Sequence, residues 1–402
     1  MNILFLTIAR IEDISTRGIY TDLMRKFSNE GHEVCIVTPT ERRYREKTNL
    51  VKYDNVTILK IWTLNILKTN LLEKGLSTLL IERQFIRSIK RHLPKIQFDL
   101  VLYSTPPITF TKVVRHFKQE YGSTSYLLLK DIFPQNAVDI GILKHGSLIY
   151  KYFRNKEKQL YTVSDYIGCM SPANTMYLCK HNPEINPEIV EVNPNSIEPV
   201  ESSITSKQRV FIREKYKIPS DSTVFIYGGN LGKPQGIGFL IEVLISQMNN
   251  IGVYFIIAGS GTEFPRIQTW FKSNQPKNAS LISELPKDEY NKLVQSSDVG
   301  MIFLDRKFTI PNFPSRLLSY LEYKLPIIAA TDKNTDLGNI IEENNFGLWS
   351  EAGDLPALSK NISILSQSSV LRRKMGQNGY DFLLNNYTVA HSYNTITNHL
   401  TL

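Results

Sequence analysis

Short apolar runs alternate with amphipathic stretches along the first half of the chain, which is typical of a parallel α/β sheet. A helix is predicted at Gly18–Glu30, between the first two apolar runs. A second, strongly basic helix is predicted at Glu82–His92. The apolar runs that predict strands are Ile3–Ile8, Val34–Val37, Val56–Ile61, Leu100–Tyr103, Tyr126–Leu129 and Tyr166–Cys169. The first half is therefore expected to form a Rossmann-like, doubly wound domain.

A second series of the same kind begins at Thr223. Between the two series lie Asn193–Pro199 and the polar stretch Glu201–Lys207, whose Pro, Asn and Ser content indicates a turn and linker, so we expect domains 1–199 and 200–371. Predicted strands of the second series are Val224–Tyr227, Val253–Ile257, Val299–Phe303 and Ile327–Ala330. Predicted helices are Gly236–Ser246, Phe264–Lys272, Lys287–Ser296, Pro314–Tyr323 and Asp336–Glu343.

Length and composition agree with two globular domains, since the 402 residues are 42% hydrophobic and 21% charged. No run of 18 apolar residues predicts a membrane-spanning helix, and the apolar start lacks a signal-peptide cleavage site. Three widely spaced cysteines favour a reducing compartment, which we expect to be the cytoplasm. Two doubly wound domains joined by a linker are expected to face a central cleft, with ligands at the carboxyl ends of the strands.

Glycine turns follow two predicted strands of the second domain. Tyr227–Gly236 contains Gly229, Gly232 and the cation of Lys233, which suits close approach of the backbone to a phosphate. The turn Ala258–Gly261 follows the next strand. Each turn alone is equally compatible with an ordinary strand-to-helix connection.

The segment Ile310–Tyr320 contains a third feature, an arginine at a predicted helix start. Pro314 suits the first helical turn, and Arg316 would then lie in that turn. The helix dipole disfavours a cation there, so Arg316 is better explained as a ligand of a bound diphosphate than as a surface arginine.

Taken in order, these segments resemble the donor-binding half of retaining GT-B glycosyltransferases of family four, most closely the N-acetyl-L-fucosamine transferase type of capsule and O-antigen enzymes. Asn193–Ile197 is similar to the linker turn of that family, and Lys130–Pro134 to an Arg-Asp-Leu-Trp-Pro segment of the subgroup. The further markers are Leu285–Lys287, Ser297–Gly300 and the run from Pro314 to Ile328.

The resemblance implies transfer of a sugar, N-acetylated or 6-deoxy amino in type, from a UDP-sugar held by the second domain to a polyprenyl-diphosphate-linked acceptor held by the first. It also implies that 372–402 are helices crossing back to the first domain. The implied catalytic residues are Asp131, Lys233 and Arg316. The implied donor-binding residues are Gly18, Gly229, Asn230, Gly232, Gly259, Gly261, Pro314, Ser315, Leu317, Ser319 and Glu322.

The chain departs from the family pattern at several positions. Asn230 and Gln235 stand where the family has an arginine and a lysine, and Pro311 and Ser319 stand where it has two glutamates. Ser319, or Glu322 one turn further on, could contact the ribose. No Asp-x-Asp motif occurs, so we expect no metal, with Lys233 and Arg316 offsetting the charge of the leaving diphosphate.

Two residues of the first domain have alternative explanations. Asp131 follows a predicted strand and could orient donor sugar or acceptor hydroxyl, or could cap a helix or pair with Lys130. Gly18 follows the long loop Ile11–Arg17 and could lie near the diphosphate, or could be a simple helix-start glycine.

The positive charge is concentrated in the first half, where 27 Lys and Arg oppose 20 Asp and Glu, against 20 and 18 in the remainder. No zinc-finger or RNA-binding aromatic pattern accompanies it, so nucleic acid is the weaker partner. Lys74–Lys95 and Tyr150–Leu160 resemble basic amphipathic helices that could lie on the anionic inner membrane, although ordinary solvated faces explain single helices of this kind.

Two other functions stay open. A GT-B sugar-nucleotide epimerase would lack membrane affinity and need acidic and histidine residues that we do not find. A non-catalytic GT-B partner is favoured by the missing glutamates and opposed by Lys233, Arg316 and the glycine turns.

Overall fold

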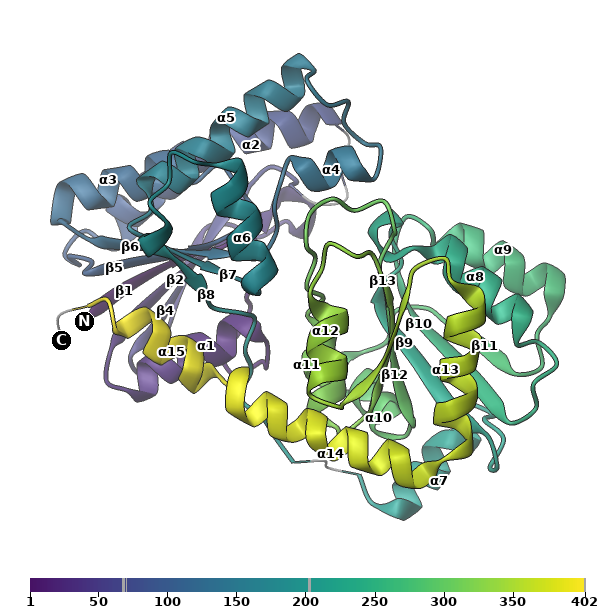
Figure 1. The fold of residues 1–402 in the computed structure, drawn as a ribbon. Coiled ribbons are helices and arrows are strands. Elements are labelled where there is room, and N and C mark those ends of the chain that lie inside the picture. The colour runs from purple at the N-terminus through teal and green to yellow at the C-terminus, as the bar shows by residue number, and fades with distance from the viewer. Residues whose placement is uncertain (67–68, 70, 202–203, 401–402) are drawn as a thin grey trace. The chain divides into compact units, whose positions relative to one another are not determined.

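The computed structural model describes residues 1–66, 69, 71–201 and 204–400, which form two compact units (Figure 1). Unit 1 consists of Met1–Glu198 and Thr388–Leu402, and unit 2 of Pro199–Tyr387. Each unit is built around its own sheet with helices on both faces, as expected for doubly wound domains.

The sheet of unit 1 has eight strands in the order β3-β4-β2-β1-β5-β6-β7-β8. All neighbours are parallel except β3, which is antiparallel to β4. The six predicted strands are present, whereas two edge strands, β3 and β8, were not predicted. The strands are β1 (Asn2–Leu6), β2 (Glu33–Glu41), β3 (Asn49–Tyr53), β4 (Val56–Thr63), β5 (Leu100–Ser104), β6 (Thr124–Leu129), β7 (Tyr166–Cys169) and β8 (Val190–Val192).

Helices cover both faces of this sheet, with α1 and α15 on one face and α2, α3 and α5 on the other (Figure 1). The predicted basic helix Glu82–His92 is the second half of a longer helix, α2. The helices of unit 1 are α1 (Ile19–Asn29), α2 (Leu71–His92), α3 (Thr111–Tyr121), α4 (Gln135–Asp139), α5 (Leu148–Val163), α6 (Pro172–His181) and α15 (Val389–Thr397), with 3-10 turns η1 (Arg42–Tyr44) and η2 (Pro187–Ile189).

The sheet of unit 2 has six parallel strands in the order β11-β10-β9-β12-β13-β14. Chain order reverses between β9 and β12, which makes this pair the topological switch point of the sheet. The strands are β9 (Thr223–Asn230), β10 (Val253–Ser260), β11 (Ala279–Ile282), β12 (Val299–Phe303), β13 (Ile327–Thr331) and β14 (Gly347–Glu351).

The five helices predicted for this unit are present, with ends shifted by a few residues. The helix α14, which the sequence analysis grouped with the crossover helices, belongs to unit 2, and only α15 belongs to unit 1. The helices are α7 (Ser206–Lys215), α8 (Ile237–Ser246), α9 (Phe264–Asn274), α10 (Lys287–Gln295), α11 (Arg316–Glu322), α12 (Leu337–Glu343), α13 (Leu355–Gln367) and α14 (Ser369–Asn386), with the 3-10 turn η3 (Lys233–Gln235).

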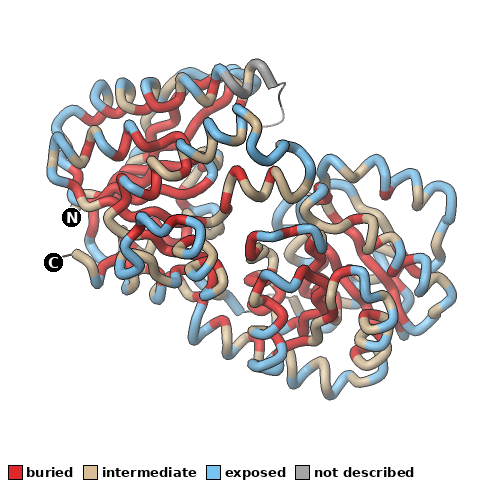
Figure 2. Tube along the Cα trace, turned by 45° about the horizontal axis from the view of Figure 1, so that its top comes forward, coloured by how far each residue is buried: buried red, intermediate tan, exposed pale blue. Residues whose placement is uncertain are grey.

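The central strands of both sheets are buried on both faces, which explains why they form continuous apolar runs in the sequence. In Figure 2 the buried segments form the middle of each unit, and the exposed segments surround them. In unit 2, Phe225, Tyr227, Phe255 and Ile257 pack against residues of α8, α9 and α13, among them Leu240.

The last helix of the described chain, α15, packs on α1 of unit 1, as Figure 1 shows for the yellow and purple helices. The rings of Phe27 and Tyr393 lie 4.9 Å apart, and the Tyr393 hydroxyl lies 2.9 Å from Nε2 of His32. A β-bridge joins Ile197 to Thr388. Residues after Thr388 therefore complete the core of the N-terminal unit.

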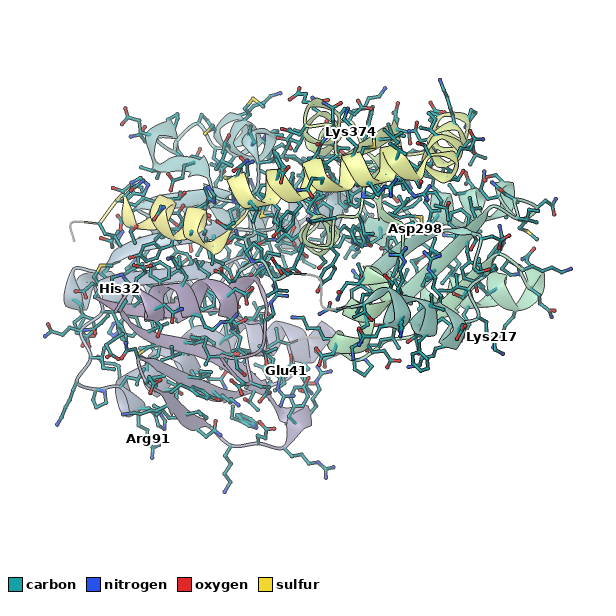
Figure 3. The ribbon with its side chains drawn as sticks, turned by 90° about the horizontal axis from the view of Figure 1, so that it is seen from below. His32, Glu41, Arg91, Lys217, Asp298 and Lys374 are labelled. Atoms are coloured by element: carbon teal, nitrogen blue, oxygen red, sulfur yellow. The ribbon has the colours of Figure 1, made fainter. Side chains whose placement is uncertain are left out.

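A partly buried ion-pair network joins three elements of unit 2 around Asp298, which Figure 3 labels. Its Oδ1 and Oδ2 accept hydrogen bonds of 2.6 Å from Arg209 and Arg213 of α7. Oδ2 also accepts the backbone N–H of Val224, at 2.8 Å. The carboxylate thus holds α7 against the starts of β9 and β12.

We expect Asp298→Ala to lower the free energy of unfolding by about 3 kcal/mol, because it leaves two partly buried guanidinium groups without their carboxylate. Urea denaturation of the purified protein measures this loss. The matched control is Asp221→Ala, which removes an exposed carboxylate of the same unit and should stay within about 0.5 kcal/mol of wild type. Equal midpoints for both variants would contradict the structural role of Asp298.

Candidate functional site

The two predicted glycine turns lie side by side at the carboxyl ends of β9 and β10. Gly229 pairs with Gly259 and Asn230 with Ser260 in the parallel ladder. A Cβ on Gly259 would lie 1.8 Å from the carbonyl oxygen of Gly229, and φ of Gly259 is +151°. Only glycine can occupy position 259, because any side chain there would collide with the backbone of the first turn.

Gly261 makes a second close approach in the same corner. A Cβ there would lie 2.4 Å from the carbonyl oxygen of Leu231. Gly232 lies against the side chain of Asn230, with an ideal Cβ 3.0 Å from Nδ2. Gly229 and Asn230 are exposed, and φ of Gly229 is +114°, so the backbone at the end of β9 is open to a ligand.

Arg316 lies over this turn from the first position of α11. Its guanidinium carbon is 4.3 Å from the ring centroid of Tyr227, a cation–π distance, and Nη2 donates a 2.7 Å hydrogen bond to Oε1 of Gln235. Nη2 also lies 3.7 Å from an ideal Cβ on Gly229. The structure therefore brings Arg316, Gly229 and Gln235 together at the switch point of the sheet.

One nitrogen of the Arg316 guanidinium group has no hydrogen-bond acceptor among the described residues. Nη1 is buried and makes no hydrogen bond to any residue that the structure describes. A buried donor without an acceptor is costly, and a ligand oxygen would satisfy it. Burial acts to lower the pKa of Arg316, but its interactions with Tyr227 and Tyr320 outweigh burial and raise the pKa. The group is thus a permanent cation.

Three tyrosines support this arrangement, and the sequence analysis assigned none of them a role. The Tyr227 hydroxyl donates to the carbonyl oxygen of Asn230 at 2.7 Å, and the Tyr320 hydroxyl accepts the backbone N–H of Gly228 at 3.1 Å. A Cβ on Gly228 would lie 1.9 Å from the Tyr290 hydroxyl. Gly228 is therefore needed to admit the Tyr290 ring beside β9.

The remaining candidates of α11 occupy different positions. Ser315 is the N-cap and is exposed, Leu317 is buried in the core, and Ser319 is half-buried. Pro314 was expected in the first helical turn but precedes the N-cap, because the helix begins at Arg316. The carbonyl of Pro314 still accepts the N–H of Leu317, at 3.2 Å.

Lys233 and Glu322 have surroundings that differ from those of Arg316. Lys233 begins the η3 turn and its side chain is exposed. Glu322 is buried, and its Oε1 accepts the backbone N–H of Val200 at 2.9 Å. That bond ties the linker to the end of α11 and is a structural use of this carboxylate.

In unit 1, Asp131 follows β6 at the carboxyl edge of the sheet. Its Oδ1 accepts a 2.7 Å hydrogen bond from Nδ2 of Asn136, and its N–H donates to Oγ1 of Thr105 at 3.1 Å. Nζ of Lys130 donates to the carbonyl of Asn193 at 3.0 Å, not to Asp131. Burial raises the pKa of Asp131 to about 6 and lowers the pKa of Lys130 to about 7.

The raised pKa of Asp131 predicts a pH-dependent cost to stability. Between about pH 4 and pH 6 the folded protein holds a proton here that the unfolded chain has lost, so this contribution to stability falls as pH rises. We expect Asp131→Asn to gain about 1–2 kcal/mol over wild type from pH 5 to pH 7.5, after allowance for partial exposure. Urea denaturation at both pH values measures it, and an equal difference at the two would contradict the prediction.

Gly18 precedes α1 in unit 1, at the carboxyl end of the same sheet as Asp131. Its N–H donates to Oδ1 of Asp22 at 2.9 Å, and its φ of 172° is ordinary extended backbone. An ideal Cβ would lie 3.3 Å from Oγ1 of Thr21. The local geometry therefore fits a helix-start residue held by Asp22.

The two basic segments are helices, but the apolar residues of α2 do not all face outward. Within the basic segment Lys74–Lys95, Phe85, Ile89 and Leu93 are buried in the core of unit 1. The side chain of Lys74 lies outside the described residues. Apolar exposure is found at Leu76 and Leu79 of α2, which are 51% and 62% exposed, and at the start of α5, where Leu148 and Ile149 are 85% and 59% exposed.

Two features are absent from the described residues, a membrane-spanning helix and a metal-binding cluster. None of the helices that the structure describes is long and apolar enough to cross a membrane. Within the same residues, no group of three or more His, Cys, Asp and Glu side chains could hold a metal ion.

Parts of the chain are similar to known proteins in sequence. Residues 208–382 match the family described as glycosyl transferases group 1. The probable glycosyltransferase WbjE of Pseudomonas aeruginosa is 24% identical over 324 residues, which are 79% of each chain.

Solved structures show the same fold over nearly the full length. Sucrose-phosphate synthase of Thermosynechococcus elongatus matches with a TM-score of 0.75 and 14% identity, over 99% of this chain and 97% of that one. Anabaena HepE in complex with UDP matches with a TM-score of 0.69 and 12% identity, over 100% and 99%. The chain is a glycosyltransferase of the GT-B fold, and residues 208–382 carry its match to the group 1 glycosyl transferases.

Proposed function

We propose that this glycosyltransferase moves a sugar from a UDP-sugar to a lipid-diphosphate-linked acceptor during synthesis of a bacterial surface polysaccharide, with retention of configuration. The observation that carries the donor assignment is Nη1 of Arg316, which has no hydrogen-bond partner among the described residues and lies beside the open backbone of Gly229. A nucleotide diphosphate supplies anionic oxygens for both groups. That HepE is described in complex with UDP supports this choice of nucleotide.

The proposed reaction depends less on a protein nucleophile than on stabilisation of the leaving diphosphate. When the bond between the sugar and the diphosphate breaks, negative charge grows on the leaving oxygen, and a cation already in place stabilises it. Arg316 is held by the Tyr227 ring and by Gln235 before any ligand binds, so little reorganisation is needed. Lys233, exposed on η3, is proposed to add a second positive charge to the same diphosphate.

The ribose contact is proposed for Ser319. Pro311 and Ser319 occupy the positions of the two family glutamates, and Ser319 is half-buried on α11, three residues after Arg316. Glu322 already accepts the N–H of Val200, which makes it the weaker candidate. A serine hydroxyl contributes less than a carboxylate, so more of the binding energy must come from Arg316.

For the acceptor we propose unit 1, with Asp131 orienting the acceptor hydroxyl or the donor sugar and Gly18 close to the diphosphate. The membrane surface is proposed at the start of α5, where exposed Leu148, Ile149 and Tyr152 lie next to Lys151. Apolar side chains beside a lysine suit an anionic bilayer, here the cytoplasmic face of the inner membrane. By the family resemblance of the sequence, we propose an N-acetylated or 6-deoxy amino sugar as the transferred group and O-antigen or capsule synthesis as the process.

Calorimetry of UDP, GDP and dTDP with the purified protein, without added metal, tests the donor assignment. We expect UDP to bind at least about tenfold more tightly than the other two, because a UDP-sugar site must contact the uracil ring and binding of the diphosphate alone does not distinguish bases. Equal affinity for all three would remove UDP from the proposal. Absence of binding by any nucleotide would overturn the donor site itself.

A further inference from the structure

Unit 1 contains a basic pocket outside the candidate site residues discussed so far. It has a volume of about 340 Å³ and lies between the loop before β3 and the last turns of α2. Figure 3 labels one of its residues, Arg91, at the outer edge of unit 1. The lining residues are Lys47, Thr48, Arg87, Ser88, Arg91 and His92.

The charges of this pocket are not balanced locally. None of the six lining residues is acidic, and Lys47, Arg87 and Arg91 form no ion pair with any residue that the structure describes. The nearest carboxylate in sequence, Glu46, lies 3.2 Å from Nη2 of Arg10. Elsewhere on α2, Lys90 is paired with Glu120, also at 3.2 Å.

Holding these cations together costs stability unless an anion joins them. Arg87 and Arg91 are four residues apart on one helix, a spacing at which like charges repel. Lys47 adds a third charge from a different element. A bound anion would attract all three side chains and so offset their mutual repulsion.

The donor groups around the cations suit phosphate oxygens. Guanidinium groups bind phosphate through two parallel hydrogen bonds. Oγ1 of Thr48 accepts the N–H of Trp62 at 3.0 Å, which leaves its own proton free to donate, and Ser88 adds a second hydroxyl. Nδ1 of His92 lies 2.9 Å from the Ser88 carbonyl oxygen, so the outer ring nitrogen remains for the pocket.

We propose that this pocket is a binding site for a phosphate or diphosphate group. The same chemistry occurs in the head group of an anionic lipid and in free phosphate or diphosphate, and the test separates these sources. The site lies wholly in unit 1 and uses none of the residues of the proposed donor site. Its occupancy therefore does not depend on that proposal.

The test measures binding by the full-length chain in low salt. The probes are inorganic phosphate and inorganic diphosphate by calorimetry, and vesicles of phosphatidylcholine with or without phosphatidylglycerol by cosedimentation. The variant Arg87→Ala/Arg91→Ala is compared with Arg83→Ala/Lys95→Ala, which removes the same charge from exposed positions outside the pocket. Lys47→Ala tests the loop side of the pocket without altering α2.

We expect the pocket variant to weaken binding at least about tenfold, Lys47→Ala about threefold, and the control pair less than about twofold. Pocket-dependent binding of diphosphate but not of vesicles identifies a free anion. Pocket-dependent binding of phosphatidylglycerol vesicles, displaced by diphosphate, identifies a lipid head group. Equal losses in the pocket and control variants, or no binding of any probe by wild type, would overturn the proposal.

Discussion

Arg316→Ala is expected to lower kcat/KM for sugar transfer by about 10²–10³ and to weaken UDP binding by about 10- to 100-fold. The residue supplies a fixed cation at the switch point, and its Nη1 has no acceptor among the described residues. Removing it takes away both charge stabilisation of the leaving diphosphate and a charge-assisted hydrogen bond to it. Calorimetry and a radiolabelled transfer assay measure the two losses.

Two further variants separate this effect from general damage. Arg316→Lys keeps the charge but cannot lie flat on Tyr227 while donating to Gln235, so we expect partial recovery of binding and little of kcat. Arg373→Ala removes an exposed arginine of α14 and should leave both measurements unchanged within about twofold. Near-normal transfer by a folded Arg316→Ala protein would overturn the proposed mechanism.

The second large effect is expected for Gly259→Ala. Its methyl group would lie 1.8 Å from the carbonyl oxygen of Gly229, and the φ of +151° is a conformation that alanine rarely adopts. The ends of β9 and β10 must therefore separate, at a cost of about 3 kcal/mol or more. We expect a lower urea midpoint, and loss of UDP binding by whatever fraction remains folded.

Gly252→Ala provides the matched comparison. It lies in the turn before β10, has no positive φ, and an added Cβ would make only an ordinary 3.5 Å contact with Asn250. Its stability should stay within about 1 kcal/mol of wild type. If Gly259→Ala were equally mild, the close approach of the two glycine turns would not be a requirement of the fold.

Much of the fold could be predicted because buried parallel strands are apolar on both faces. Val299–Phe303 and Tyr166–Cys169 were predicted with their observed bounds. The edge strand Asn49–Tyr53 was missed, since none of its residues is fully buried and it contains Asn and Lys, which are uncommon in strands. The predicted amphipathic segment Lys74–Lys95 covers most of α2 (Leu71–His92) but starts and ends three residues too late, because an apolar periodicity alone does not show where a helix begins.

The candidate site was predictable as a place but not as a set of contacts. Glycine turns and Arg316 mark the carboxyl ends of the strands, and the structure brings them together. Gln235 was noted only as a lost positive charge, yet it holds Arg316 by a 2.7 Å hydrogen bond. Tyr290 comes from α10, and its packing on Gly228 depends on tertiary distance that spacing along the chain does not encode.

The direction in which the apolar face of a helix points is the other feature that the sequence does not predict, as α2 shows. Its charges and apolar residues suggested a lipid-facing helix, whereas Phe85 and Ile89 belong to the core of unit 1. An amphipathic helix has the same sequence pattern whether its apolar side meets a bilayer or its own sheet. Only the neighbouring elements decide between the two.

The packing of α15 on α1 has a consequence for the order in which the protein can be made. On the ribosome, Leu23 and Phe27 of α1 emerge early, while Val389 and Ile396, which share their core, emerge only after the whole of unit 2. At ~5–20 residues per second this leaves an apolar face of the N-terminal unit uncovered for about 20–70 s. Nascent chains in this interval are the form most in need of a chaperone.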